Sequence, residues 1–245
     1  MLIDKYKKLF LIIEDIYFAK ELQSSTADIV RYIQYSEYNI ENNKKEFNTN
    51  VVDLNSDIED IQSEFRKSIK SELNQAVKNH NIKIDFFYKP DDSEIDNFCK
   101  FYNAMARIKN LSFANKNKII RLKDNILLSE AKLNGETLVS HLYIFDKTRI
   151  RLLYSASLQT EDNELFKIVS KANKLLHFQD IKFSKDKQFK IYDFGGISLV
   201  DEKVAGIDQF KLGFSKIVEK SCHVTKGNTF IGKMILFFYE FKGKF

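Results

Sequence analysis

The chain has 245 residues, of which 44% are hydrophobic and 30% are charged. This balance excludes a disordered chain and predicts a folded protein with a substantial core. The net charge of +5, from 39 basic and 34 acidic residues, is mild and spread along the sequence, so it predicts no nucleic-acid-binding arm.

Cysteine usage and apolar runs bear on the compartment. Cys99 and Cys222 lie far apart with no metal-ligand spacing around them, which favours a reduced cytoplasmic protein and leaves a disulfide open. The N-terminal apolar run is broken at Glu14 and Asp15, unlike the core of a signal peptide. The run over residues 234–241 is far shorter than the ~20 residues of a membrane-spanning helix. We therefore expect neither export nor a membrane span.

In chain order, residues 9–19 predict one or two strands, although so continuous an apolar run is also typical of a buried helix. Residues 24–55 are polar, and we assign strand or irregular structure around residues 29–38. A helix is predicted from Asn55 or Ser56, because apolar residues recur three or four apart at Ile58, Ile61, Phe65, Ile69, Leu73 and Val77.

The middle of the chain predicts a three-stranded meander. Residues 82–88 alternate as a strand, and Pro90-Asp91-Asp92-Ser93 introduces a helix over residues 94–109, followed by a short helix over 116–123. Strands at 126–133 and 137–145 flank Asn134-Gly135, a strong hairpin signal, and a third strand follows at 149–154.

Helical spacing then returns over residues 165–179, with a second helix start expected near Ser170. A strand over residues 189–194 is expected to stop at Gly195 and Gly196, which places Asp193 at a strand end. A short helix is expected around residues 207–214, and strands at 216–225 and 228–241 to close the sheet. Interleaved strands and helices indicate an α/β or α+β class with a mixed sheet.

Three motifs occur in order, KANKLLHF at 171–178, YDFGGI at 192–197 and GIDQFKLGF at 206–214. Together they resemble the C-terminal half of the GNAT-like acyltransferases of bacterial surface-polysaccharide biosynthesis, which are relatives of the peptidoglycan-bridge aminoacyltransferases. The resemblance covers about residues 137–214. It implies a GNAT-like, mostly antiparallel sheet flanked by helices, with an acyltransferase core at 90–245 and a smaller GNAT-like half at 1–89.

The resemblance implies that an acyl group passes from acyl-CoA to the amino group of a nucleotide-linked aminodeoxy sugar, such as a dTDP-sugar, in the cytoplasm. The product would serve O-antigen or capsule assembly. Direct attack in a ternary complex is expected, because the sequence has no Gly-x-Ser-x-Gly elbow and adjacent Cys222 and His223 would point to opposite faces of a strand.

For the donor, the resemblance implies an acyl-CoA site between the last meander strand and the strand after the helix. The family's glycine-rich pyrophosphate loop is missing, since no glycine lies between Asp146 and Gly195. Small and cationic residues are the nearest equivalents, and each is equally typical of a solvated loop or helix face: Ser155, Ser157, Ser170, Lys171 and Asn173.

Two residues are candidate catalytic groups. His177 has Asp180 three residues on, so the carboxylate can orient the imidazole, although a histidine bonded to backbone is the simpler interpretation. Asp193 precedes two glycines and can accept the amine proton or bind sugar hydroxyls, or merely cap a turn.

The remaining candidates concern the acceptor. Gly195 and Gly196 let a bound group approach the backbone, and Lys211 can meet an acceptor phosphate or lie exposed on its helix. Asp180 is a candidate partner of the acceptor. His141, on a strand face shared with Val139 and Tyr143, is another candidate that packing alone would also explain. No metal site is predicted.

Two other functions stay open at this point. One is an aminoacyltransferase that takes its donor from charged tRNA, although the dispersed charge does not indicate a basic groove. The other is a non-catalytic GNAT-like domain that binds a partner through an aromatic-rich C-terminal strand, since the chain has 22 phenylalanines. The oligomeric state, including a homodimer, is also open.

Overall fold

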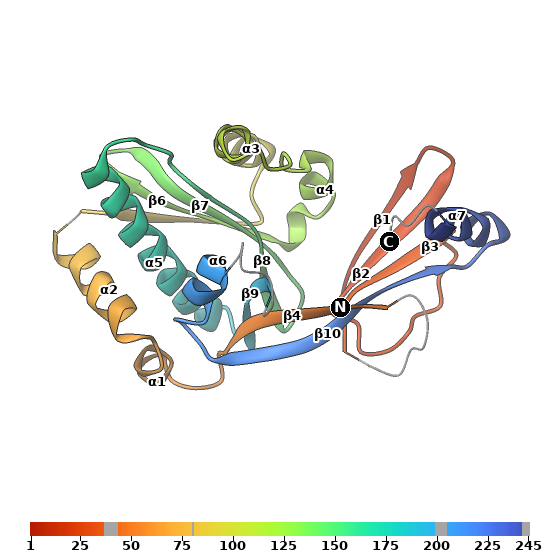
Figure 1. Ribbon diagram of the computed structural model, residues 1–245, viewed down its shortest axis with the longest axis horizontal. Coiled ribbons are helices and arrows are strands. Elements are labelled where there is room, and N and C mark those ends of the chain that lie inside the picture. Colours follow the sequence, from red (N-terminus) through yellow and green to blue (C-terminus); the bar gives the residue numbers. More distant parts are fainter. Residues whose placement is uncertain (37–43, 80, 199–204, 242–245) are drawn as a thin grey trace. The chain divides into compact units, whose positions relative to one another are not determined.

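The computed structural model describes residues 1–36, 44–79, 81–198 and 205–241 (Figure 1). The chain forms two compact units, one made of Met1–Thr49 with Val218–Phe245 and the other of Asn50–Ile217. It passes from the first unit to the second within strand β4 (Lys44–Asp53) and returns at the start of strand β10 (Ile217–Gly227). The expectation that residues 1–89 and 90–245 each form a GNAT-like half concerns the similarity of these segments to GNAT domains, and it stays a prediction.

The first unit is a small mixed sheet with one helix. Its strands lie in the order β1 (Leu2–Lys8), β2 (Leu11–Tyr17), β3 (Ile29–Tyr35) and β10. Strands β2 and β3 are parallel, and the other neighbouring pairs are antiparallel. The strands predicted within residues 9–19 and 216–225 are confirmed, while residues 37 and 38 of the 29–38 prediction lie outside the described residues.

The C-terminal strand predicted over residues 228–241 is wrong, because this segment forms helix α7 (Phe230–Phe241). The Thr229 hydroxyl accepts a hydrogen bond from the Gly232 amide, which caps the first turn of the helix. Leu236 is buried against Ile13 and Ile29. The segment is apolar on nearly all sides, so periodicity could not separate helix from strand.

The second unit is a larger sheet with helices on both faces. Its strands lie in the order β4, β9, β8, β7, β6 and β5. The new strands are β5 (Lys83–Tyr88), β6 (Ile126–Leu133), β7 (Glu136–Phe145), β8 (Arg149–Ser157) and β9 (Ile191–Ile197). The helical elements are α1 (Ile58–Ser63), α2 (Lys67–Asn79), α3 (Asp92–Ile108), α4 (Lys116–Arg121), the 3₁₀ turn η1 (Lys123–Asn125), α5 (Asn163–Asp186) and α6 (Ala205–Lys211).

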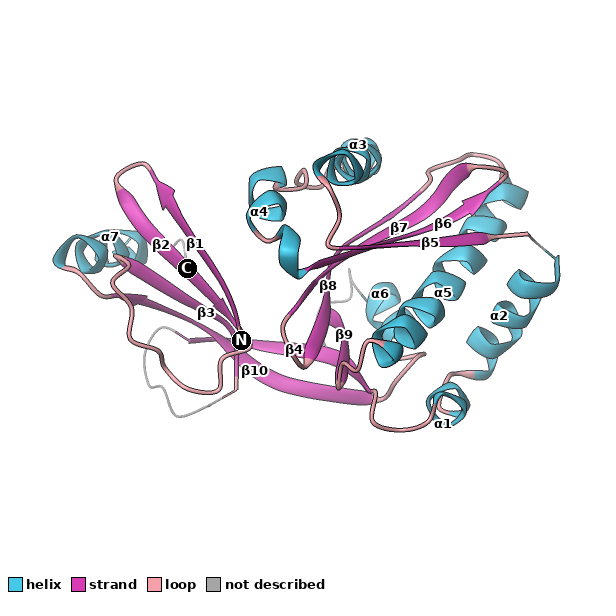
Figure 2. Cartoon of the chain, turned by 180° about the vertical axis from the view of Figure 1, so that it is seen from behind, coloured by secondary structure: helices cyan, strands magenta, loops and turns pink. Residues whose placement is uncertain are grey.

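In this second unit, α5 lies on one face of the sheet with α2 packed against it, and α3 lies on the other face with α4 (Figure 1 and Figure 2). The mixed, mostly antiparallel class predicted from the sequence is confirmed. None of the helices in the described residues combines the length and apolar character needed to cross a lipid bilayer.

Local signals in the middle of the chain predicted structure well. Asn134 and Gly135 have φ of 51° and 86°, the left-handed conformation that a tight hairpin between β6 and β7 needs. Asp91 and Glu94 form a reciprocal capping box at the start of α3. The predicted hairpin and the helix predicted after Pro90 are confirmed.

Two helix boundaries differ from the prediction. The helix expected from residue 56 is divided into α1 and α2, because the Arg66 amide donates to the Gly213 carbonyl, at 2.7 Å, instead of continuing the first helix. The helix start expected near Ser170 is wrong, since α5 is continuous from its N-cap Asp162 to Asp186.

Strand β9 does not stop at its glycines. It continues through Gly195, whose φ of +79° is one that side chains with a Cβ rarely adopt. The parallel pairing with β8 covers three residue pairs, Arg149 with Ile191, Ile150 with Tyr192 and Arg151 with Asp193. Beyond that point both strands continue, β8 to Ser157 and β9 to Ile197, with no further pairing between them among the described residues.

A buried ion pair links the first and last paired positions, Arg149 on β8 and Asp193 on β9. The Arg149 guanidinium donates to Asp193 Oδ2 at 2.7 Å, and the Gly195 amide donates to Asp193 Oδ1 at 2.7 Å. Asp193 is fully buried. Its carboxylate therefore joins the two strands where they stop pairing, in the middle of β9 and not at a strand end.

We expect Arg149→Met to destabilise the protein by roughly 3 kcal/mol, because the buried Asp193 carboxylate would lose its cation. The matched control is Lys167→Met, which removes the exposed pair with Glu164 and should cost less than about 1 kcal/mol. Urea unfolding of the two variants measures the difference. Equal losses would contradict the importance of the Arg149 pair.

Candidate functional site

A cavity of about 690 Å³ lies in the second unit, beside the unpaired parts of β8 and β9. We call it the β8–β9 cavity. Its β8 residues (Leu152, Ser155 and Ser157) and its β9 residue (Phe194) all follow the last paired position. The rest of the lining comes from α3, α5, α6 and the segment after α3: Met105, Lys109, Leu111, Asn173, His177, Gly206, Ile207, Phe210 and Lys211. An apolar wall with a few converging polar groups is typical of a small-molecule site.

The structure brings together five of the residues singled out from the sequence. Ser155, Ser157, Asn173, His177 and Lys211 all line the cavity. They come from β8, α5 and α6, so elements separated by up to 56 positions in the chain contribute to one wall.

Other predicted residues do not line it. Ser170 and Lys171 lie inside the continuous helix α5, where their backbone amides belong to the helix. The carboxylate of Asp193 is bound by Arg149 and the Gly195 amide, and neither Asp193 nor the two glycines contribute to the lining.

Behind His177 lies a buried polar cluster. His177 Nδ1 is 2.7 Å from the Tyr192 hydroxyl, which is 2.7 Å from the Tyr143 hydroxyl. Tyr143 donates to Asp180 Oδ2 at 2.6 Å. His141 and Asp180, which were predicted from the sequence, therefore lie next to the cavity and not in its lining.

His141 completes the cluster on the far side of Asp180. Its Nδ1 lies 2.7 Å from Asp180 Oδ2, and its Nε2 lies 2.9 Å from Asn173 Oδ1. Its ring also packs against the ring of His177, with centroids 4.1 Å apart. The cluster thus ties β7, α5 and β9 together beneath the cavity.

Burial sets the protonation of these groups. It lowers the pKa of His177 well below the ordinary value, with further lowering by His141 and Lys211. Burial and the nearby Asp180 charge raise the pKa of Tyr143 and of Tyr192 well above the ordinary value. At neutral pH His177 is therefore a neutral imidazole, able to accept a proton, and both tyrosines keep theirs.

Lys211 is a cation of the cavity wall whose charge contributes to lowering the pKa of His177. Its Nζ donates to the Gly196 carbonyl at 2.6 Å. Burial lowers its pKa, while Asp208 and Asp193 counteract part of the shift. The sequence left open an exposed position for Lys211, and the structure places it in the wall of the cavity.

The side chains of His141, His177 and Asp180 offer ligand atoms within 4.8 Å of one another, which is a spacing that a metal ion can use. Here His141 Nδ1 and Asp180 Oδ2 are bonded to each other. The 2.7 Å separation of His141 Nδ1 and Asp180 Oδ2 is shorter than the ~3.3 Å expected between two ligands of a tetrahedral zinc ion. The geometry is that of a hydrogen-bonded cluster.

The start of α5 is closed to anions. The Asp162 side chain accepts hydrogen bonds from the Glu164 and Leu165 amides, and Glu164 adds a second negative charge in the first turn. A helix start binds phosphate through free amides and a positive dipole end. The start of α5 therefore does not offer the phosphate cradle that the sequence resemblance led us to look for.

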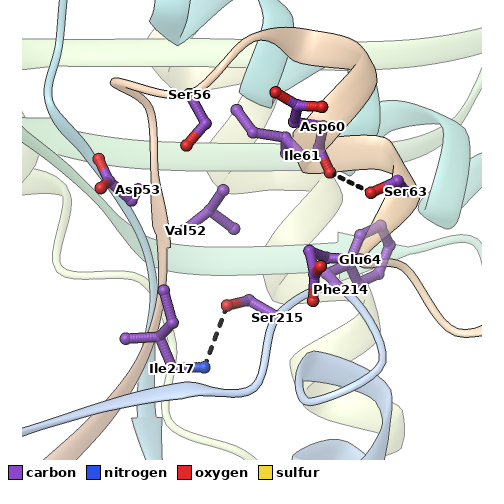
Figure 3. A pocket seen from close by; sticks show the side chains of 10 residues that line it. All are labelled: Val52, Asp53, Ser56, Asp60, Ile61, Ser63, Glu64, Phe214, Ser215 and Ile217. Carbon is purple, nitrogen blue, oxygen red and sulfur yellow. Dashed lines mark hydrogen bonds between the residues drawn. The ribbon is translucent and has the colours of Figure 1, made fainter.

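A second cavity, of about 300 Å³, lies between β4, α1 and the segment after α6 (Figure 3). None of the candidate site residues singled out from the sequence lines it, and its ionisable groups are the acids Asp53, Asp60 and Glu64. Acidic walls disfavour an anionic donor such as CoA. The β8–β9 cavity is the better candidate for a donor.

Sequence reasoning missed Tyr192 as part of the site. The motif YDFGGI directed attention to Asp193, yet side chains alternate along a strand, so Tyr192 and Phe194 share the face opposite to Asp193. Both contact the His177 ring. The alternation of side chains along the strand expected at 189–194 was the signal that could have identified Tyr192.

No family model and no curated protein matches this sequence. Solved structures do resemble its fold. The crystal structure of FemX aligns with a TM-score of 0.65 and 12% identity, over 98% of this chain and 85% of FemX. The C-terminal domain of a putative lysylphosphatidylglycerol synthetase from Agrobacterium fabrum aligns with a TM-score of 0.61 and 8% identity, over 96% and 83%.

L-PGS from Bacillus licheniformis aligns with a TM-score of 0.54 and 11% identity, over 85% of this chain and 71% of that one. The GNAT-like fold predicted from the sequence is confirmed. At these identities the likeness concerns the fold alone.

The depressed pKa of His177 gives a prediction about stability. In the unfolded chain its pKa returns to ~6.5, so between that value and the lower folded pKa the unfolded state binds the extra proton. The free energy of unfolding should therefore be intact above about pH 6.5 and fall below it, by up to about 1.4 kcal/mol per pH unit. Denaturant unfolding between pH 7 and about pH 5 measures this slope.

His177→Gln should flatten the slope in that window, because the variant lacks the buried imidazole whose pKa differs between the folded and unfolded states. His223→Gln, in the first unit, is the matched control and should keep the wild-type slope. An unchanged slope in His177→Gln would mean that the buried imidazole titrates normally.

Proposed function

We propose that this protein is an acyltransferase that joins an acyl or aminoacyl group to an amine in the β8–β9 cavity. The observation that supports this most strongly is the neutral imidazole of His177, buried in the wall of a cavity that opens where two parallel strands separate. Because its pKa is lowered, His177 is unprotonated at neutral pH and can accept the proton that an attacking amine must lose.

In the proposed step, the amine nitrogen attacks the carbonyl carbon of the donor. A carbon–nitrogen bond forms, and the bond from the carbonyl carbon to the leaving sulfur or oxygen breaks. The amine proton passes to His177 Nε2 and then to the leaving thiolate or alkoxide. The donor and amine react directly, so positioning in the cavity supplies much of the rate.

Lys211 is assigned the binding of an oxygen of the reactants. Lys211 lies in the cavity wall, and its Nζ donates one hydrogen bond to the Gly196 carbonyl. An ammonium group has three N–H donors, so others can bind a carbonyl or phosphate oxygen. Ser155, Ser157 and Asn173 are assigned contacts with the donor. Asp193 is assigned a structural role at the end of the strand pairing, because its carboxylate is bound by Arg149.

The resemblance in sequence supports acyl-CoA as donor, a nucleotide-linked amino sugar as acceptor and a cytoplasmic setting. The closed start of α5 instead favours a donor that needs no pyrophosphate cradle. An aminoacyl ester of tRNA is such a donor, and the sequence motifs are shared with relatives of the peptidoglycan-bridge aminoacyltransferases. We therefore retain aminoacyl-tRNA as the second candidate donor.

The test is a transfer assay with two labelled donor sets, a series of acyl-CoAs and a set of aminoacyl-tRNAs, each with amino nucleotide-sugars and other amine acceptors. Wild-type protein should transfer label to an amine from one of the sets. His177→Gln should lower kcat by about 10²- to 10⁴-fold, as expected for loss of a general base. Circular dichroism confirms that the variant is folded.

The control is His223→Gln, which should keep wild-type activity. Label transferred from no donor, or equal activity in the two variants, would contradict the proposal. Indifference to His177 would favour the non-catalytic interaction domain.

A further inference from the structure

We infer that Tyr192, Tyr143 and Asp180 are positioning residues that hold His177 in one tautomer, with the proton on Nδ1 and the lone pair on Nε2. The inference rests on the proposed role of His177 as the base. It goes further because it assigns the acceptor atom and the residues that select it.

The hydrogen-bond chain has a fixed end. Asp180 is fully buried on α5, and an ionised carboxylate can only accept hydrogen bonds. The Tyr143 hydroxyl lies 2.6 Å from Asp180 Oδ2, so the single Tyr143 proton points at Asp180. The oxygen of Tyr143 is then available to the next group only as an acceptor.

This direction passes along the chain. The Tyr192 hydroxyl lies 2.7 Å from the Tyr143 oxygen and must donate its only proton there. The Tyr192 oxygen can then only accept from His177 Nδ1, also at 2.7 Å. Nδ1 therefore carries the proton, and Nε2 keeps its lone pair.

The opposite tautomer would break a contact. If Nε2 carried the proton, Tyr192 would have to donate to Nδ1, and the Tyr192 and Tyr143 oxygens would face each other at 2.7 Å without a proton between them. Turning the Tyr143 proton toward Tyr192 would instead leave Asp180 without that donor. Either change leaves a buried polar contact unmade, which is costly away from water.

The position of His177 makes Nε2 the atom that accepts a proton in the cavity. His177 lines the cavity, and no described residue forms a hydrogen bond with Nε2. The charged or titratable groups around the ring are Tyr192 from β9, His141 and Tyr143 from β7, Asp180 on its own helix and Lys211 from α6. After proton uptake, the chain through the tyrosines connects the imidazolium to the Asp180 carboxylate.

The direct test is nitrogen NMR of wild-type protein labelled with ¹⁵N in its histidines, at neutral pH. The His177 signals are identified by their loss in His177→Gln. We expect a protonated Nδ1 and an unprotonated Nε2. A protonated Nε2 in the wild-type protein would overturn the inference. This measurement needs no substitution of Tyr192, Tyr143 or Asp180.

Tyr192→Phe should then release the selection, because Phe cannot accept from Nδ1. We expect an increased share of the tautomer protonated on Nε2, and a kcat about tenfold lower with KM little changed. Tyr154→Phe is the matched control, since the Tyr154 hydroxyl bonds to the Asn115 amide outside the cluster, and it should match wild type.

The outcomes separate the two proposals. A wild-type protein that shows the expected tautomer but transfers no acyl group supports the positioning chain and contradicts the proposed function. If the tautomer of His177 is unchanged in a folded Tyr192→Phe variant, the inference that Tyr192, Tyr143 and Asp180 select it is overturned, even if the protein transfers acyl groups.

Discussion

The parallel pairing of β8 and β9 ends after three residue pairs, and the candidate site depends on that early end. Asp193, in the last pair, binds Arg149 from the first pair and the amide of Gly195 from its own strand. Gly195 then takes a left-handed conformation, and a Cβ there would lie 3.2 Å from the Leu152 carbonyl oxygen. The strand pairing ends at Asp193, and residues of β8 and β9 beyond it line a cavity of about 690 Å³.

The polar cluster under the cavity is costly to bury, so its completeness matters. Two tyrosines, two histidines and Asp180 are almost free of solvent contact. Burial of such groups is tolerated where each finds a partner, and most of these atoms do. Asp180 Oδ1 has no partner among the described residues, while Oδ2 accepts from both His141 and Tyr143. A cluster so interconnected fixes side-chain orientation, which catalytic positioning requires.

Local signals in the sequence were sufficient for much of the fold. The Asn134-Gly135 pair requires left-handed backbone, and the Asp91–Glu94 box satisfies amides at a helix start, so each acts over a few residues. The wrong predictions depended on contacts distant in the sequence. The α7 segment is apolar on nearly all sides, and only its packing on Ile13 and Ile29 distinguishes a helix from a strand. The division between α1 and α2 depends on a bond to Gly213.

In the candidate site, too, local signals in the sequence identified some residues, while contacts distant in the sequence determined the rest. His177 and Asp180 were singled out because they are one helical turn apart, and Lys211 because it lies within the motif GIDQFKLGF. Tyr192 was missed although it lies in the strand expected from the sequence, because the acidic Asp193 on the opposite face of that strand was taken as the functional residue. That the Asp193 carboxylate is taken up by Arg149, 44 positions away, could not be deduced from either segment alone.

The central claim is that the reacting carbonyl lies between the separated parts of β8 and β9, within reach of His177 Nε2. A crystal structure with a non-reactive donor analogue tests it most directly, using an acyl-CoA thioether or a stable amide analogue of aminoacyl-adenosine. We predict the carbon that stands for the carbonyl in the β8–β9 cavity, between Leu152 and Phe194 and facing His177. An analogue bound only in the acidic cavity between β4 and α1, or with its reactive end directed away from His177, would contradict the account.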